Sequence, residues 1–158
     1  MSVVTSTVTV NAAFFQEIKE DDRQLRELFQ ETVAMFSGPR RHRLPARQIV
    51  DQLWRIRDQL ALHFSLEDAY GYFKDAIAEA PRLSNLAESL HAEHDGLFLE
   101  ICELVDEAEQ RLYRENHDHS QTEIAVSFYR FHARFQEHET RENELILQAF
   151  DDDIGVGD

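Results

Sequence analysis

HFSLEDAYGYF, residues 63–73, lies within a long segment that has the periodicity of a helix. Ile56 and Leu60 come before it at steps of three and four residues, the spacing of one helix face. The same spacing selects His63 and then Glu67, one helical turn further on. A helix that buries both groups needs partners for them, because an unpaired buried charge costs several kcal/mol.

Three breaks divide the chain into four segments with this periodicity. Gly and Pro punctuate residues 37–45, Pro81 lies in the connection 79–84, and residues 114–121 form a polar run without apolar spacing. With only five Gly and three Pro in 158 residues, so few breaks favour a few long helices. The sequence therefore predicts an all-α fold, an up-down-up-down four-helix bundle. The predicted helices cover residues 11–37, 45–79, 83–114 and 121–150.

The length and composition predict one domain over residues 11–150, with a flexible lead-in at 1–10 and a flexible acidic tail at 151–158. No stretch of about 18 apolar residues is present, and the first residues lack the basic and apolar regions of a signal peptide. We therefore expect a cytoplasmic protein. The single Cys102 excludes an intramolecular disulfide framework and a cysteine-rich zinc site.

The formal net charge of −15 argues against two classes of partner. Nucleic-acid binding needs a basic surface that neutralises phosphates. Docking on an anionic membrane needs a basic surface as well. We expect neither partner, and the acidity is typical of a solvated surface.

Six strongly polar residues interrupt the apolar stripes, with at least one on each predicted helix. At a rise of about 1.5 Å per residue, all of them fall at a similar depth in an up-down-up-down bundle. They also form a half-repeat, in which a single residue precedes a His-x-x-x-Glu pair by 41 residues in one half and by 44 in the other. The six are Asp22, His63, Glu67, His94, His138 and Glu142.

Three imidazoles and three carboxylates at one depth predict a metal centre. A pair of cations would satisfy all six groups, and mixed imidazole and carboxylate ligands suit iron, with manganese or zinc as alternatives. The absence of thiolates disfavours a structural zinc site. The alternative interpretation is a metal-free polar layer held together by salt bridges.

The sequence resembles the hemerythrin-like (HHE cation-binding) domain family over about residues 11–150. The resemblance rests on IKEDDRQLRELF, HFSLEDAYGYF, LHAEHDGLF and FQEHETRENELI, in that order. It implies a hemerythrin-like bundle with two iron ions, two bridging carboxylates, an oxo or hydroxo bridge and an open position for a small ligand.

Carried over by position, the resemblance implies that His63 and Asp22 bind one iron and that His94 and His138 bind the other. Glu67 and Glu142 match the two bridges. Asp22 stands where the family usually has a histidine, and the third helix has His91-x-x-His94 where the oxygen carriers have His-x-x-x-His. We expect His94 to be the ligand and His91 to flank the centre, with direct ligation by His91 as an alternative.

The predicted function is to bind, sense or scavenge O₂, NO or peroxide at a di-iron centre. The first alternative is an oxidase or peroxidase-type enzyme, for which Tyr70 and His91 are the visible proton donors. The second is a metal-free helical interaction module. A ferritin-type centre is disfavoured, because that class uses Glu-x-x-His rather than His-x-x-x-Glu pairs.

Overall fold

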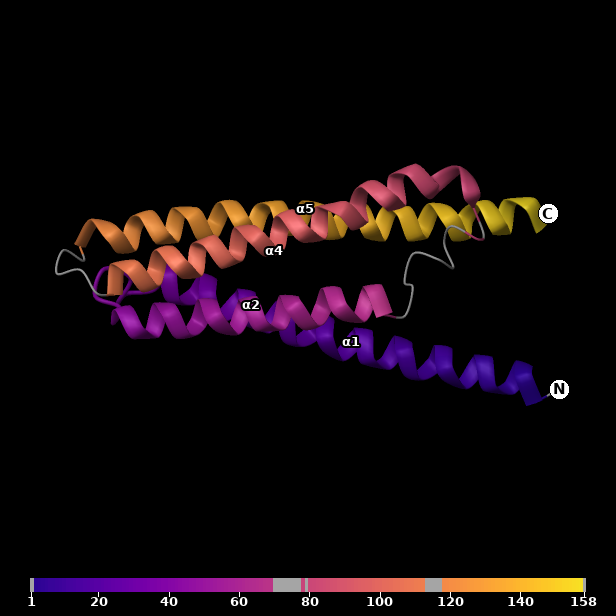
Figure 1. The fold of residues 1–158 in the computed structure, drawn as a ribbon, viewed down its shortest axis with the longest axis horizontal. Coiled ribbons are helices and arrows are strands. Elements are labelled where there is room, and N and C mark those ends of the chain that lie inside the picture. The colour runs from indigo at the N-terminus through magenta and orange to yellow at the C-terminus, as the bar shows by residue number, and fades with distance from the viewer. Residues whose placement is uncertain (1, 70–77, 79, 113–117, 158) are drawn as a thin grey trace.

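The computed structural model describes residues 2–69, 78, 80–112 and 118–157, and every helix within them is part of one bundle. Successive α-helices run in opposite directions, so the chain goes up, down, up and down, and both termini lie at the same end (Figure 1). The described residues contain no strand. The predicted all-α four-helix bundle is therefore confirmed. Its elements are α1 (Ser2–Ser37), α2 (Ala46–Ala69), the short 3₁₀ helix η1 (Pro81–Leu83), α4 (Ser84–Leu112) and α5 (Asp118–Gly157).

Two of the helix breaks lie where the Gly and Pro residues predicted them. The helix α1 ends just before Gly38, where a Cβ would lie 2.8 Å from the carbonyl oxygen of Ala34, so only glycine fits. The next helix begins after Pro45, whose carbonyl accepts a hydrogen bond from the amide of Gln48 at 3.0 Å. Pro81 opens η1 directly before α4.

The outer helices are longer than the apolar periodicity predicted. The first helix begins at Ser2 rather than at residue 11, and the last covers Asp118–Gly157 rather than 121–150. Neither Gly nor Pro occurs in residues 2–37 or 118–154, so no residue there interrupts the ladder of backbone hydrogen bonds. The flexibility of the two ends stays a prediction. The predicted helix ends at residues 79 and 114 lie outside the described residues.

The core consists of two hydrophobic clusters separated along the bundle axis. The larger cluster has aromatic rings at its centre, where Phe29 packs against Phe128 and Phe135 with ring centroids 6.2 and 5.2 Å apart. The smaller cluster contains Leu83, Leu90 and Leu145, among others. Within the described residues, none of these amphipathic helices has an apolar stretch that would let it cross a membrane.

Candidate metal centre

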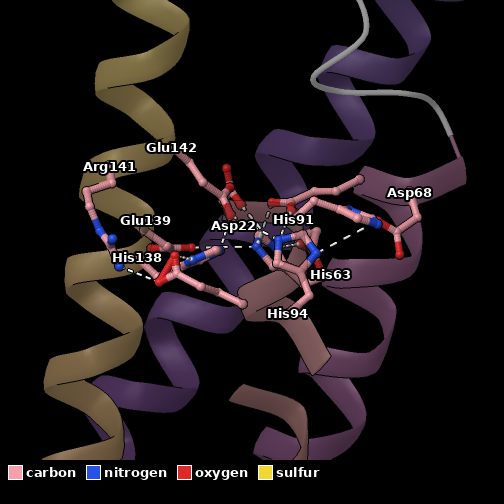
Figure 2. Close-up of polar contacts among 12 residues, drawn as sticks. Asp22, His63, Asp68, His91, His94, His138, Glu139, Arg141 and Glu142 are labelled. Carbon is pink, nitrogen blue, oxygen red and sulfur yellow. Dashed lines mark hydrogen bonds and ion pairs between the residues drawn. The ribbon is translucent and has the colours of Figure 1, made fainter. Parts of the chain in front are cut away.

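A layer of buried polar side chains lies between the two hydrophobic clusters. It contains five of the six predicted residues, and its side chains point toward one another from different helices (Figure 2). The predicted coincidence in depth is therefore confirmed for these five. The sixth, Asp22, lies at the edge of the layer with its side chain 39% exposed. We call this set the polar layer: Asp21, His63, Glu67, His94, His138 and Glu142.

Glu67 joins the two halves of the polar layer. Its Oε1 lies 3.0 Å from His63 Nε2, and its Oε2 lies 3.1 Å from His94 Nε2. One carboxylate thus directs one oxygen at an imidazole of each half, as a bridging carboxylate would. The side chain is 5% exposed, so these contacts are shielded from water.

Glu142 contacts the two histidines of the α4–α5 half. Its Oε1 lies 3.1 Å from His94 Nε2 and is in close contact with His138 Nε2. The ligand atoms of these three residues all lie within 4.8 Å of one another. The sequence placed Glu142 as a second bridge, but these contacts lie within one half of the layer.

On α1 the buried carboxylate is Asp21, which the sequence analysis missed. Its Oδ2 accepts a hydrogen bond of 2.6 Å from His63 Nδ1, and its Oδ1 accepts one of 2.8 Å from Gln59 Nε2. The neighbouring Asp22 has its Oδ1 3.5 Å from the same Nδ1. Asp21 lies three residues after Ile18 and four before Leu25, so it fits the apolar spacing as well as Asp22 does.

Several buried nitrogen and oxygen atoms in the layer lie close to a group of opposite charge without forming a hydrogen bond. His63 Nε2, Glu67 Oε2 and His138 Nε2 are all buried in this way. Since His63 donates its Nδ1–H to Asp21, a neutral His63 directs the Nε2 lone pair at Glu67 Oε1. Two lone pairs about 3 Å apart repel unless a proton or a cation lies between them. The donor set therefore fits a metal ion.

The ionisation of the metal-free layer reflects the same crowding. Burial would lower the pKa of His63, but the hydrogen bond to Asp21 and the close carboxylate of Glu67 outweigh it and raise the pKa to about 11. Burial likewise opposes the shift at His94, where contacts with Glu142 and Glu67 raise the pKa to about 9. Burial would raise the pKa of Glu67, whereas the close contacts with His63 and His94 lower it.

Glu139 is a second residue that the sequence analysis missed. Its Oε1 lies 3.7 Å from His63 Nε2, and Figure 2 shows it reaching toward the layer from α5. Burial raises the pKa of Glu139 to about 7 and that of Asp22 to about 6, against the attraction of His63. The sequence contains one signal for Glu139. It lies four residues after Phe135 and three before Glu142, which is the spacing of one helix face.

The Nδ1 atoms of His94 and His138 also face carboxylates. In each case the carboxylate lies on the preceding helix of the chain. Asp68 Oδ1 on α2 lies 3.8 Å from His94 Nδ1, and Glu93 Oε2 on α4 lies 3.6 Å from His138 Nδ1. His91 is exposed and its Nδ1 lies 3.1 Å from Asp68 Oδ1, so it flanks the layer as expected. Asp68, His91 and His94 could also hold an ion together. Tyr70 lies outside the described residues.

Aromatic rings hold the imidazoles on the side of the larger cluster. Phe64 stacks on His94, with ring centroids 4.3 Å apart and an interplanar angle of 17°. The edge of Phe135 meets His63 at 5.9 Å. These contacts limit rotation of the rings, so the Nε2 atoms stay directed into the layer.

A groove between α1 and α5 reaches the layer from the surface. The cavity has a volume of about 580 Å³, and its walls combine apolar side chains such as Phe29 with polar ones such as Arg26 and Gln136. His63, Glu67 and Glu139 line it as well. The groove therefore reaches His63 in the α1–α2 half of the layer, whereas in the α4–α5 half it is lined by Glu142 but not by His94 or His138.

Comparison of the chain with protein-family models, curated proteins and solved structures finds no match to any of them.

Proposed function

We propose that this protein binds a pair of metal ions, iron in the first place, and uses them to bind a small ligand such as O₂, NO or peroxide. The proposal includes the hemerythrin-like resemblance of the sequence and takes manganese and zinc as alternative metals. His63 and Glu67 contribute to one metal position, and His94, His138 and Glu142 to the other. Glu67 connects the two positions.

The observation that carries the proposal is the convergence of buried nitrogen and oxygen atoms that have no hydrogen-bond partner. His63 Nε2, His138 Nε2 and Glu67 Oε2 are directed into one layer and lie close to oppositely charged groups. Such atoms are costly to bury unless something pairs them. Imidazole and carboxylate together form a ligand set for iron.

The balance of charge supports cations over a purely salt-bridged layer. Seven carboxylates lie within 3.8 Å of the nitrogens of three imidazoles, so even three protonated imidazoles leave excess negative charge. Bound divalent cations would offset it while the imidazoles stay neutral ligands. The seven carboxylates belong to Asp21, Asp22, Glu67, Asp68, Glu93, Glu139 and Glu142.

Iron bound in this layer would supply an open coordination position and reversible redox chemistry. The chain's own part is to hold and orient the ligand atoms. Asp21 fixes the tautomer of His63, because its carboxylate accepts the Nδ1 proton and leaves Nε2 for the metal. Phe64 and Phe135 pack against the imidazoles and limit their motion.

A second candidate function is an oxidase or peroxidase-type reaction at the same centre. The observation that favours it is the groove of about 580 Å³, which is larger than a diatomic ligand needs. Turnover also needs proton delivery, and Asp22 and Glu139 line the groove next to the layer. Consumption of peroxide over many cycles would distinguish the enzyme from the binding protein.

Metal analysis of protein purified without oxygen tests the proposal. We expect about two irons per chain, the number that the paired ligand sets define. We also expect an absorption change on adding azide or O₂ and a higher melting temperature than that of the metal-free chain. A chain that holds no metal after loading with Fe²⁺, with unchanged stability, would leave the metal-free interaction module as the better account.

A further inference from the structure

We propose that Glu139, rather than Asp22, supplies the carboxylate that completes the metal position at His63. This inference rests on the proposed function. It assigns a ligand to the half of the centre where the histidine of the half-repeat is missing. It also makes the two positions chemically different, with one imidazole at the first and two at the second.

The two nitrogens of His63 have different surroundings, and only one is left for a metal. Nδ1 lies 2.6 Å from Asp21 Oδ2, and Gln59 occupies the other oxygen of that carboxylate, so this side forms a complete hydrogen-bonded set. Nε2 is buried and has no hydrogen-bond partner. A metal bound at Nε2 keeps the hydrogen bond to Asp21, whereas a metal at Nδ1 would break it.

Glu139 lies on the Nε2 side and Asp22 on the Nδ1 side. The Oε1 atoms of Glu67 and Glu139 lie 3.0 and 3.7 Å from Nε2. Donor atoms bound at about 2.0–2.2 Å to one ion lie roughly 3 to 4 Å apart, so each of these oxygens is at a distance from Nε2 that suits a shared metal. Asp22 Oδ1 is instead 3.5 Å from Nδ1. Asp21, Asp22 and His63 form a tight group, but it forms around the nitrogen that is already bonded.

The sequence next to His138 explains how one helix serves both positions. His138 and Glu139 are adjacent on α5, so their side chains point about 100° apart. His138 contacts Glu142 in the second position, while Glu139 reaches His63 across the bundle (Figure 2). The motif His-Glu-x-x-Glu therefore carries ligands for both metals.

One imidazole with two carboxylates is a harder ligand set than two imidazoles with a shared carboxylate. Manganese favours the harder set and zinc accepts imidazole readily. Mn²⁺ should therefore bind more tightly at the first position, formed by His63, Glu67 and Glu139, than at the second. The second position, formed by His94, His138 and Glu142, should hold Zn²⁺ more tightly than the first does.

Titration of the metal-free chain with Mn²⁺, followed by the electron paramagnetic resonance of the free ion, tests this assignment. We expect Glu139→Gln to weaken the tighter Mn²⁺ position at least 10-fold and to leave Zn²⁺ binding at the other unchanged. Glu137→Gln is the matched control, because Glu137 carries the same side chain on the same helix and is exposed. Asp22→Asn should weaken Mn²⁺ binding less than Glu139→Gln does.

The outcomes separate this inference from the proposed function. A wild-type chain that binds two metals while Glu139→Gln binds both as tightly overturns the inference alone. A larger loss for Asp22→Asn than for Glu139→Gln also overturns it, and places the metal at Nδ1. A wild-type chain that binds no metal overturns both. Equal melting temperatures of the metal-free variants establish that the effect is not a loss of fold.

Discussion

The α1–α2 half of the centre and the α4–α5 half have equivalent places in the sequence repeat but different surroundings. In the α4–α5 half, His94 and His138 share Glu142, and all three are buried. In the α1–α2 half, a single imidazole, His63, is surrounded by carboxylates, and a groove connects it with the surface.

This difference follows from one position in the repeat. His94 in the second half corresponds to Asp22 in the first, so the first half lacks an imidazole. Carboxylates from α1 and α5 surround His63 instead. The half whose imidazole lines the groove is thus the more negative one. If the halves are linked through Glu67 and otherwise independent, a substitution at Glu67 should affect both halves and a substitution elsewhere only one.

The largest effect is expected for Glu67→Ala, because Glu67 contacts both halves. Its loss leaves His63 and His94 without their shared carboxylate, and breaking a buried ion pair costs about 3–5 kcal/mol. Metal should be lost from both positions. Urea unfolding of the metal-free chain and metal analysis after loading check the two parts.

Asp51→Ala is the control for that variant, since Asp51 is exposed on the same helix. We expect wild-type stability and metal content for the control. Full retention of one metal in Glu67→Ala would show that the halves do not depend on a shared carboxylate.

A smaller loss, confined to one half, is expected for His138→Gln. The substitution removes an imidazole that contacts Glu142 but does not touch the contacts of His63. The metal content after loading should fall to about half, since one of the two ligand sets is removed. His91→Gln, in the exposed residue beside Asp68, should keep the full content. A full metal content in His138→Gln, or a loss of metal in His91→Gln, would show that the ligand in the α4–α5 half has been assigned to the wrong histidine.

Asp21→Asn should act on the α1–α2 half alone and through His63. The neutral amide oxygen accepts the hydrogen bond from Nδ1 more weakly than the charged carboxylate does, so the imidazole is held less firmly. Loss of such an outer partner lowers metal affinity about 10–100-fold. Titration with Mn²⁺ should show the loss at one position only, and equal weakening of both would contradict the independence of the halves.

The smallest effect is expected at His132, in the wall of the groove. Its ring stacks on Phe29, with centroids 4.5 Å apart, and burial lowers the pKa of His132 from its ordinary value of 6.5. Below pH 6.5 the unfolded chain binds a proton at His132 more readily than the folded chain does. The free energy of unfolding therefore decreases as the pH falls. In urea unfolding, the wild type should therefore lose stability relative to His132→Phe when the pH is lowered from 7.5 to 5.5. An identical difference at both pH values would contradict this.

The sequence was sufficient to predict the bundle and the depth of the layer. The breaks at Gly38, Pro45 and Pro81 divide the helices, and a constant rise per residue then places His63, His94 and His138 at one level. These features depend only on local spacing, so they carried over to the structure.

The sequence was not sufficient to choose between adjacent residues. Asp21 and Asp22 both fit the stripe of α1, as His138 and Glu139 both fit that of α5. Which neighbour turns inward depends on the rotation of each helix about its axis, and packing against other helices sets that rotation. The hydrogen bond from His63 to Asp21 joins residues 42 positions apart, so local spacing contains no signal for it.

The most direct test of the metal centre is a crystal structure of the iron-loaded chain with anomalous diffraction measured at the iron edge. The account predicts one peak beside His63 Nε2, near Glu67 and Glu139, and a second among His94, His138 and Glu142. Iron-loaded crystals with no peak in the polar layer would contradict it.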